Sequence, residues 1–117
     1  MIRGDDGILA GARDCLIVID TTTADPTSTA VLADELAAKG VTFVDAPLGR
    51  TPKEAEAGTL DAMVGCDAAT FAMIKPVLDC WAGNITHVGD TGSGHKMKLL
   101  MNFISMGYAA LYAEATV

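Results

Sequence analysis

The sequence predicts an α/β fold in which buried parallel strands alternate with helices. Residues 15–20 form a nearly continuous apolar run rich in β-branched residues, which is typical of a strand buried on both faces. The residues after this run are typical of the start of a helix, with Asp25 as the N-cap and Pro26 as the first helical residue. Strand-like and helix-like segments continue to alternate after that point, as they do in βαβ units.

Each further element follows from local signals in chain order. A single helical turn is expected at 8–12, ahead of the first strand. The first helix should run to about residue 39 and end at Gly40, because glycine commonly ends a helix. The later elements are a strand at 41–46 closed by Pro47, a polar loop at 48–58, a strand at 59–64, a helix at 67–78 kinked or broken near Pro76, a short strand at 84–88, and a long helix that opens at the glycines near residue 92.

Composition limits the classes of function. Acidic residues outnumber basic ones by 15 to 8, and the net charge of −7 argues against non-specific binding to nucleic acid. No apolar run is long enough to cross a bilayer. The three cysteines are odd in number and widely spaced, which favours a reduced, cytoplasmic setting, and no His, Cys, Asp or Glu spacing suggests a metal site. The polar start and the apolar end suggest a piece of a larger protein.

The final helix carries an unusual polar stripe. Lys98, Asn102 and Ser105 stand at positions i, i+4 and i+7, so they share one narrow face of an otherwise apolar helix. Gly92 and Gly94 open that helix. They lack the third glycine of a dinucleotide-binding loop, so we interpret them as a tight turn that allows close approach of backbone or ligand.

A second polar group follows the second strand. Gly49, Arg50 and Thr51 come after the carboxyl end of that strand, which is the edge where parallel sheets present ligands. A guanidinium group there can bind an oxyanion through two parallel hydrogen bonds. We interpret Asp20 and Asp45, which end strands, as structural caps. His87 should pack within a strand, and His95 adjoins the glycine turn, where it is a candidate ligand contact.

Four segments in order resemble the β-hydroxyacid dehydrogenase family, which includes 3-hydroxyisobutyrate, tartronate semialdehyde and 6-phosphogluconate dehydrogenases. Residues 20–26 resemble its D-x-S-T-x-x-P segment, and residues 45–47 begin its D-A-P-V-S-G-G segment. Residues 57–65 are similar to A-G-T-L-x-x-M-V-G. Gly92, Gly94, Lys98 and Asn102 match G-x-G-x-x-x-K-x-x-N-N, and the resemblance covers essentially the whole chain.

The resemblance implies an enzyme with NAD or NADP as cofactor and a Rossmann-type parallel sheet. Residues 1–90 would be the second half of its dinucleotide-binding domain, and residues 91–117 the start of the interdomain helix. An all-helical domain and the phosphate-binding loop would lie outside this chain. The resemblance also implies a homo-oligomer acting on a small anionic substrate.

Roles for individual residues follow from the same resemblance. Lys98 would be the general acid or base, and Asn102 would hydrogen-bond the reacting oxygen or the lysine. The anionic end of the substrate would be held by Gly49, Arg50, Thr51 and Ser105. The cofactor would contact Thr23 and His95.

The chain also departs from the family pattern. Gly49, Arg50 and Thr51 replace S-G-G, and with Ser105 they resemble the sulfolactaldehyde reductase branch, while Met101 replaces the first asparagine of the N-N pair. Arg50 suits a sulfonate as well as the carboxylates 3-hydroxyisobutyrate, tartronate semialdehyde and succinic semialdehyde. A different class of function, a non-catalytic fragment or interaction module derived from this fold, is also compatible with the residues.

Overall fold

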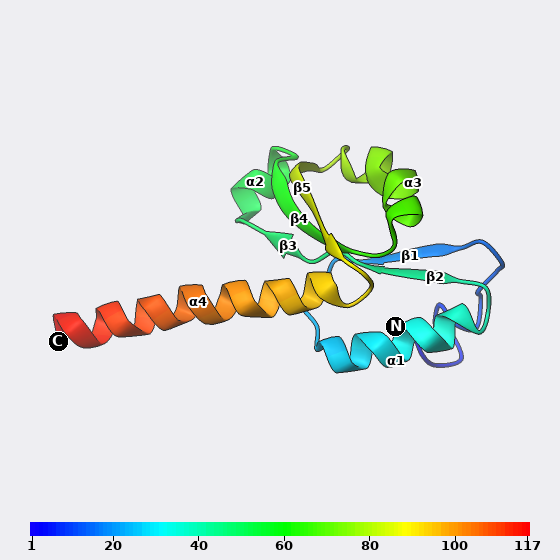
Figure 1. The fold of residues 1–117 in the computed structure, drawn as a ribbon, viewed down its shortest axis with the longest axis horizontal. Coiled ribbons are helices and arrows are strands. Elements are labelled where there is room, and N and C mark those ends of the chain that lie inside the picture. The colour runs from blue at the N-terminus through cyan, green and yellow to red at the C-terminus, as the bar shows by residue number, and fades with distance from the viewer.

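The computed structural model describes all 117 residues and confirms the α/β class (Figure 1). Its core is a single five-stranded sheet in the order β1-β2-β4-β3, with β5 paired to β4. The elements are β1 (Ile17–Asp20), α1 (Pro26–Ala37), β2 (Thr42–Asp45), β3 (Leu48–Gly49), α2 (Pro52–Glu56), β4 (Leu60–Gly65), α3 (Ala68–Leu78), β5 (Ala82–Gly89) and α4 (Ser93–Thr116).

The first βαβ unit matches its local signals. The Asp25 side chain accepts a hydrogen bond of 3.0 Å from the Thr27 amide, and Pro26 is the first helical residue. Helix α1 ends two residues earlier than expected, and Gly40 follows with a φ of +71°, a conformation that glycine adopts without strain. Strands β1 and β2 then pair in parallel, so their carboxyl ends meet at one edge of the sheet.

The sheet is mixed, whereas the sequence pattern predicts a parallel one. Asp45 of β2 lies opposite Gly65, and Leu48 and Gly49 of β3 lie opposite Ala62 and Asp61. Strands β2 and β3 therefore continue one another along β4, and both run antiparallel to it. The connection from β3 to β4 is too short for the crossover that parallel pairing needs, so the chain turns back on itself.

The expected polar loop at 48–58 contains β3 and α2. Helix α2 is short because glycine follows it at position 58 with a φ of +68°. Helix α3 starts at the Asp67 N-cap, as the sequence indicates, and continues unbroken through Pro76 to Leu78. Pro76 stands two residues before the helix end, so the hydrogen bond that its missing amide removes belongs to the last turn and the earlier turns are left intact.

Aliphatic side chains from β2, β4 and α3 form the main core. Val44, Val64, Ile74 and Leu78 are almost completely buried there. His87 on β5 packs as expected: its ring stacks on Phe71 with centroids 4.6 Å apart, and its Nε2 contacts the Cys66 carbonyl oxygen at 2.6 Å. A smaller cluster of Leu36, Val41 and Phe43 lies under α1.

Helix α4 leaves the body of the protein after its first turns (Figure 1). Its first turns pack against β4, β5, β2 and α1. Gly94 and His95 are the buried residues of this helix, whereas Phe103 is 77% exposed and Leu111 is 68% exposed. None of the helices combines the length and apolarity that a membrane span requires.

The three cysteines should differ sharply in reactivity. Burial, helped by the neighbouring carboxylates of Asp67 and Asp45, raises the pKa of the Cys66 thiol to about 11, while Cys15 and Cys80 are exposed. At pH 8 roughly one Cys66 thiol in a thousand would be ionised, and the thiolate is the reactive form. We expect iodoacetamide to label Cys15 and Cys80 in the folded chain and Cys66 only after denaturation, as read by peptide mass spectrometry. Labelling of all three at similar rates would contradict this placement of Cys66.

Candidate functional site

The Asp45 carboxylate anchors the start of α4. Asp45 is fully buried at the end of β2. One of its oxygens accepts a hydrogen bond from the Gly92 amide at 2.6 Å, and the other accepts from the His95 amide at 2.8 Å. The N-cap residue Gly92 has no side chain and a φ of +92°, so a distant carboxylate satisfies amides that a local cap would normally serve.

Two glycines make room for that carboxylate. A Cβ atom on Gly65 would lie 2.5 Å from Asp45 Oδ1. A Cβ atom on Gly94 would lie 2.4 Å from the Met63 carbonyl oxygen and 2.7 Å from that of Asp45. The close approach that the glycine turn allows is therefore between α4 and the sheet.

His95 faces the interior and presents no surface to a ligand in this chain. Its side chain is fully buried, and its Nδ1 lies 2.6 Å from the Thr29 hydroxyl of α1. The Thr29 hydroxyl also lies 3.1 Å from the Asp25 carbonyl oxygen. His95 thus joins α4 to α1, and its Nε2 is buried without a hydrogen-bond partner. A direct cofactor contact by His95 has no geometric support here.

The polar stripe of α4 begins one turn beyond this anchor. Lys98 and Asn102 are half-buried, and Lys98 forms no ion pair. Ser105 is exposed, and its hydroxyl donates to carbonyl oxygens of its own helix, to Met101 at 2.8 Å and to Asn102 at 3.3 Å. Lys98 and Asn102 are therefore the members of the stripe whose side-chain groups are uncommitted.

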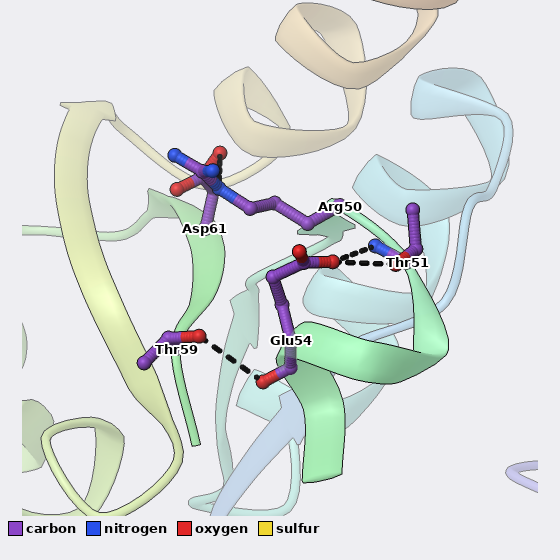
Figure 2. Close-up of polar contacts among 5 residues, drawn as sticks. All are labelled: Arg50, Thr51, Glu54, Thr59 and Asp61. Atoms are coloured by element: carbon purple, nitrogen blue, oxygen red, sulfur yellow. Dashed lines mark hydrogen bonds and ion pairs between the residues drawn. The ribbon is translucent and has the colours of Figure 1, made fainter. Parts of the chain in front are cut away.

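Arg50 and Thr51 form a corner between β3 and α2 (Figure 2). Arg50 Nε donates to Asp61 Oδ2 at 3.0 Å, and no hydrogen bond engages its terminal nitrogens. Thr51 donates from its amide at 3.0 Å and from its hydroxyl to the same oxygen of Glu54. These bonds, together with the nearby Arg50 charge, hold the pKa of the Glu54 carboxyl below its usual value. Gly49 is buried beside Asp61.

The two groups of candidate residues come from separate elements, one from α4 and the other from the corner between β3 and α2. In Figure 1, β3, α2 and the start of β4 lie above α4, on the side toward which it projects. No hydrogen bond or ion pair joins Lys98 or Asn102 to Arg50 or Thr51, and none of the four surface hollows is lined by these residues. Thr23 follows β1 and is exposed at the carboxyl edge of the parallel pair.

Sequence reasoning leaves the partners of two carboxylates in this region unidentified. Asp45 was predicted to be a structural cap, but its partners lie 47 and 50 positions away and no local pattern names them. The available signal was the glycine at the helix start, which leaves amides that need an outside acceptor. The bond between Glu54 and Thr51 does have a local sequence signal, because a threonine followed three residues later by a glutamate is the pattern of a capping box.

Replacing Asp45 by asparagine should destabilise the chain. The asparagine side-chain oxygen can accept from one of the two buried backbone amides, of Gly92 and His95. The side-chain NH2 group then faces the second backbone amide, and two donors oppose each other without an acceptor. We expect the free energy of unfolding to fall by about 2–4 kcal/mol, since each buried donor left unpaired costs roughly 1–3 kcal/mol. Urea unfolding followed by circular dichroism measures the change.

Asp20→Asn is the matched control for that experiment. Asp20 ends the neighbouring strand opposite Asp45, is only partly buried, and accepts one hydrogen bond of 2.9 Å from Thr22. Its replacement should cost less than about 1 kcal/mol, because that amide can find water instead. Equal losses for the two variants would contradict an anchoring role for Asp45.

Comparison with known proteins places this arrangement in a family. The family model for the NAD binding domain of 6-phosphogluconate dehydrogenase matches residues 1–89. Over 117 residues, the chain is 39% identical to 2-(hydroxymethyl)glutarate dehydrogenase of Eubacterium barkeri, covering all of this chain and 39% of that protein. It is 41% identical over 112 residues to 3-hydroxyisobutyrate dehydrogenase of Pseudomonas aeruginosa, covering 96% and 38% of the two chains. The match to 3-sulfolactaldehyde reductase of Escherichia coli is 34% over 117 residues, again 100% and 39%.

Solved structures of similar proteins also superpose on this chain. The 3-hydroxyisobutyrate dehydrogenase of Mycobacterium tuberculosis with L-serine superposes with a TM-score of 0.78 at 33% identity, covering 92% of this chain and 39% of that one. Psf3 in complex with NADP+ and 2-OPP gives a TM-score of 0.81 at 26% identity, covering 98% and 46%. The chain spans about two fifths of the length of the curated relatives that it matches. This chain belongs to the family of the NAD binding domain of 6-phosphogluconate dehydrogenase.

Proposed function

We propose that the chain supplies part of the active site of an oxidoreductase that transfers hydride between NAD or NADP and a small anionic β-hydroxyacid or its semialdehyde, such as 3-hydroxyisobutyrate or sulfolactaldehyde. The observation that carries the proposal is the half-buried, unpaired Lys98, with Asn102 one turn further along a helix anchored to the sheet by Asp45. The dehydrogenases and the reductase among its relatives support the reaction class.

The proposed chemistry assigns a proton to Lys98. When bound, the nicotinamide supplies or accepts the hydride at the carbon that bears the oxygen. In the reductive direction the Lys98 Nζ donates a proton to the carbonyl oxygen, and in the oxidative direction it accepts the hydroxyl proton. Asn102, one turn away on the same face, would hydrogen-bond that oxygen or the lysine and hold the geometry.

The chain's own surface suggests where a cofactor would lie. Parallel strands β1 and β2 end at one edge, the usual ligand edge of such sheets, and Thr23 is exposed there. The α4 amides of Gly92 and His95 are occupied by Asp45, so that helix start does not offer them to a phosphate. Thr23 is therefore the better candidate for a cofactor contact within residues 1–117.

We further propose that turnover needs a polypeptide of the relatives' length. Residues 1–90 would form the second half of its dinucleotide-binding domain, and residues 91–117 the start of an interdomain helix leading to a helical domain. The exposed apolar side chains of α4 support assembly into a homo-oligomer, and the three unpaired cysteines support a reducing, cytoplasmic setting.

Lys98→Ala in the full-length protein should lower kcat by roughly 10²–10⁴, which is the usual contribution of a general acid or base. Lys96→Ala is the matched control, because Lys96 is exposed on the same helix and has no proposed role. Steady-state rates of NADH or NADPH oxidation with an anionic semialdehyde measure both variants. A Lys98→Ala enzyme with near-wild-type kcat would rule out the proton-transfer role.

Arg50→Ala should act mainly on substrate binding. A hydrogen bond to a charged group contributes about 1.5–3 kcal/mol, so KM for an anionic aldehyde should rise roughly 10–100-fold while cofactor affinity stays nearly constant. An uncharged aldehyde of similar size is the control substrate, and its KM should change little. The same rise for both aldehydes would count against anion binding by Arg50.

A further inference from the structure

Asp61 is the carboxylate that contacts Arg50. It lies on β4 directly opposite Gly49 of β3, so it sits beside the residue that follows Gly49 along the chain. Its Oδ2 accepts from Arg50 Nε at 3.0 Å, and Figure 2 shows the guanidinium group reaching over to Asp61. Asp61 takes no part in the residue roles considered so far.

The backbone of the corner is shaped to make this contact. Arg50 has a φ of +80°, a left-handed conformation that residues with a side chain rarely adopt. Gly49 lies so close to Asp61 that a Cβ atom there would be 3.3 Å from the Asp61 Cβ. Glu54, the other carboxylate of the corner, is engaged by Thr51. The turn therefore directs Arg50 toward β4 and leaves Asp61 as its ion-pair partner.

Of the three guanidinium nitrogens of Arg50, Nε is the one that pairs with Asp61. Asp61 holds Nε, and its second oxygen, Oδ1, is buried without a partner. The two terminal nitrogens of Arg50 remain unengaged on a side chain that is 52% exposed. A guanidinium group fixed at Nε presents its terminal N–H groups in a defined plane, the geometry that binds a carboxylate or a sulfonate through parallel hydrogen bonds.

We propose that Asp61 is a positioning residue that orients Arg50 toward the anionic group of the substrate. This inference rests on the proposed function, in which Arg50 binds that group. Asp61 does not touch the substrate: it acts through Arg50, by fixing Nε and so restricting the orientation of a guanidinium group whose terminal nitrogens are unengaged. Carboxylate and sulfonate substrates share the oxyanion chemistry that such an orientation selects.

The test is a double-mutant cycle in the full-length protein, with 3-hydroxyisobutyrate and sulfolactaldehyde as separate substrates. Asp61→Ala should raise KM for the better substrate roughly fivefold, as befits a partly exposed ion pair, and leave kcat within about twofold. Asp61→Asn keeps an oxygen acceptor for Nε and should restore most of the lost affinity. In an Arg50→Ala background, Asp61→Ala should have no further effect on KM.

Controls separate positioning from a structural role. Asp79→Ala breaks another exposed ion pair, Lys75–Asp79 at 2.7 Å, and should leave KM unchanged. Each variant's thermal midpoint is measured by circular dichroism. If Asp61→Ala does not fold, Asp61→Leu fills a similar volume without the unpartnered buried oxygen, and the same rise in KM is expected.

Three outcomes would overturn the proposal. An unchanged or lowered KM in Asp61→Ala, with a raised KM in Arg50→Ala, would show that Arg50 binds the anion without help from Asp61. A rise of equal size in the Arg50→Ala background would show that Asp61 acts independently of Arg50. An Arg50→Ala enzyme with unchanged KM would instead refute the proposed role of Arg50 itself.

Discussion

The hydrogen bonds from two α4 amides to the buried Asp45 carboxylate are the constraint on which the rest of the structure depends. A helix that opens on glycine lacks a local acceptor for its first amides, and burying them unpaired would be costly. Asp45 provides that acceptor from the end of β2, and Gly65 and Gly94 leave the space that it needs. This contact and the packing of the first turns of α4 against β2, β4, β5 and α1 hold the start of the helix, and the rest of the helix extends away from the sheet.

This anchor determines which groups remain free for chemistry. The start of a helix is often an anion site, but here a protein carboxylate already occupies two of the α4 amides. In the proposed function the anionic substrate would be bound by side chains, and Arg50 is a cation of the β3–α2 corner whose terminal nitrogens are unengaged. Lys98, one turn beyond the anchor, keeps an uncommitted amine on the part of α4 nearest the sheet.

Features set by neighbouring residues could be predicted from the sequence, and features set by distant contacts could not. Asp25 and Asp67 cap helices through bonds to amides two or three positions away, so their roles were evident. The antiparallel course of β4 depends on a non-local pairing, and the alternation of elements alone suggested the opposite direction. Arg50 and Lys98 stand out through local patterns, a polar group after a strand and a polar stripe on a helix, and the family resemblance suggests their roles. The structure adds the partner of Arg50 and the partial burial of Lys98.

The placement of the carboxylates is compatible with the proposed binding of an anion by an acidic chain. The net charge is −7, yet the field that a small substrate meets is set by the nearest groups. Asp45 is matched by two backbone amides, Glu54 by the amide and hydroxyl of Thr51, and Asp61 by the Arg50 Nε. Asp45, Glu54 and Asp61 thus each accept from at least one donor, while the terminal nitrogens of Arg50 and the amine of Lys98 stay open. In the proposed function, the charged groups nearest the substrate would therefore favour an anion although the net charge of the chain is negative.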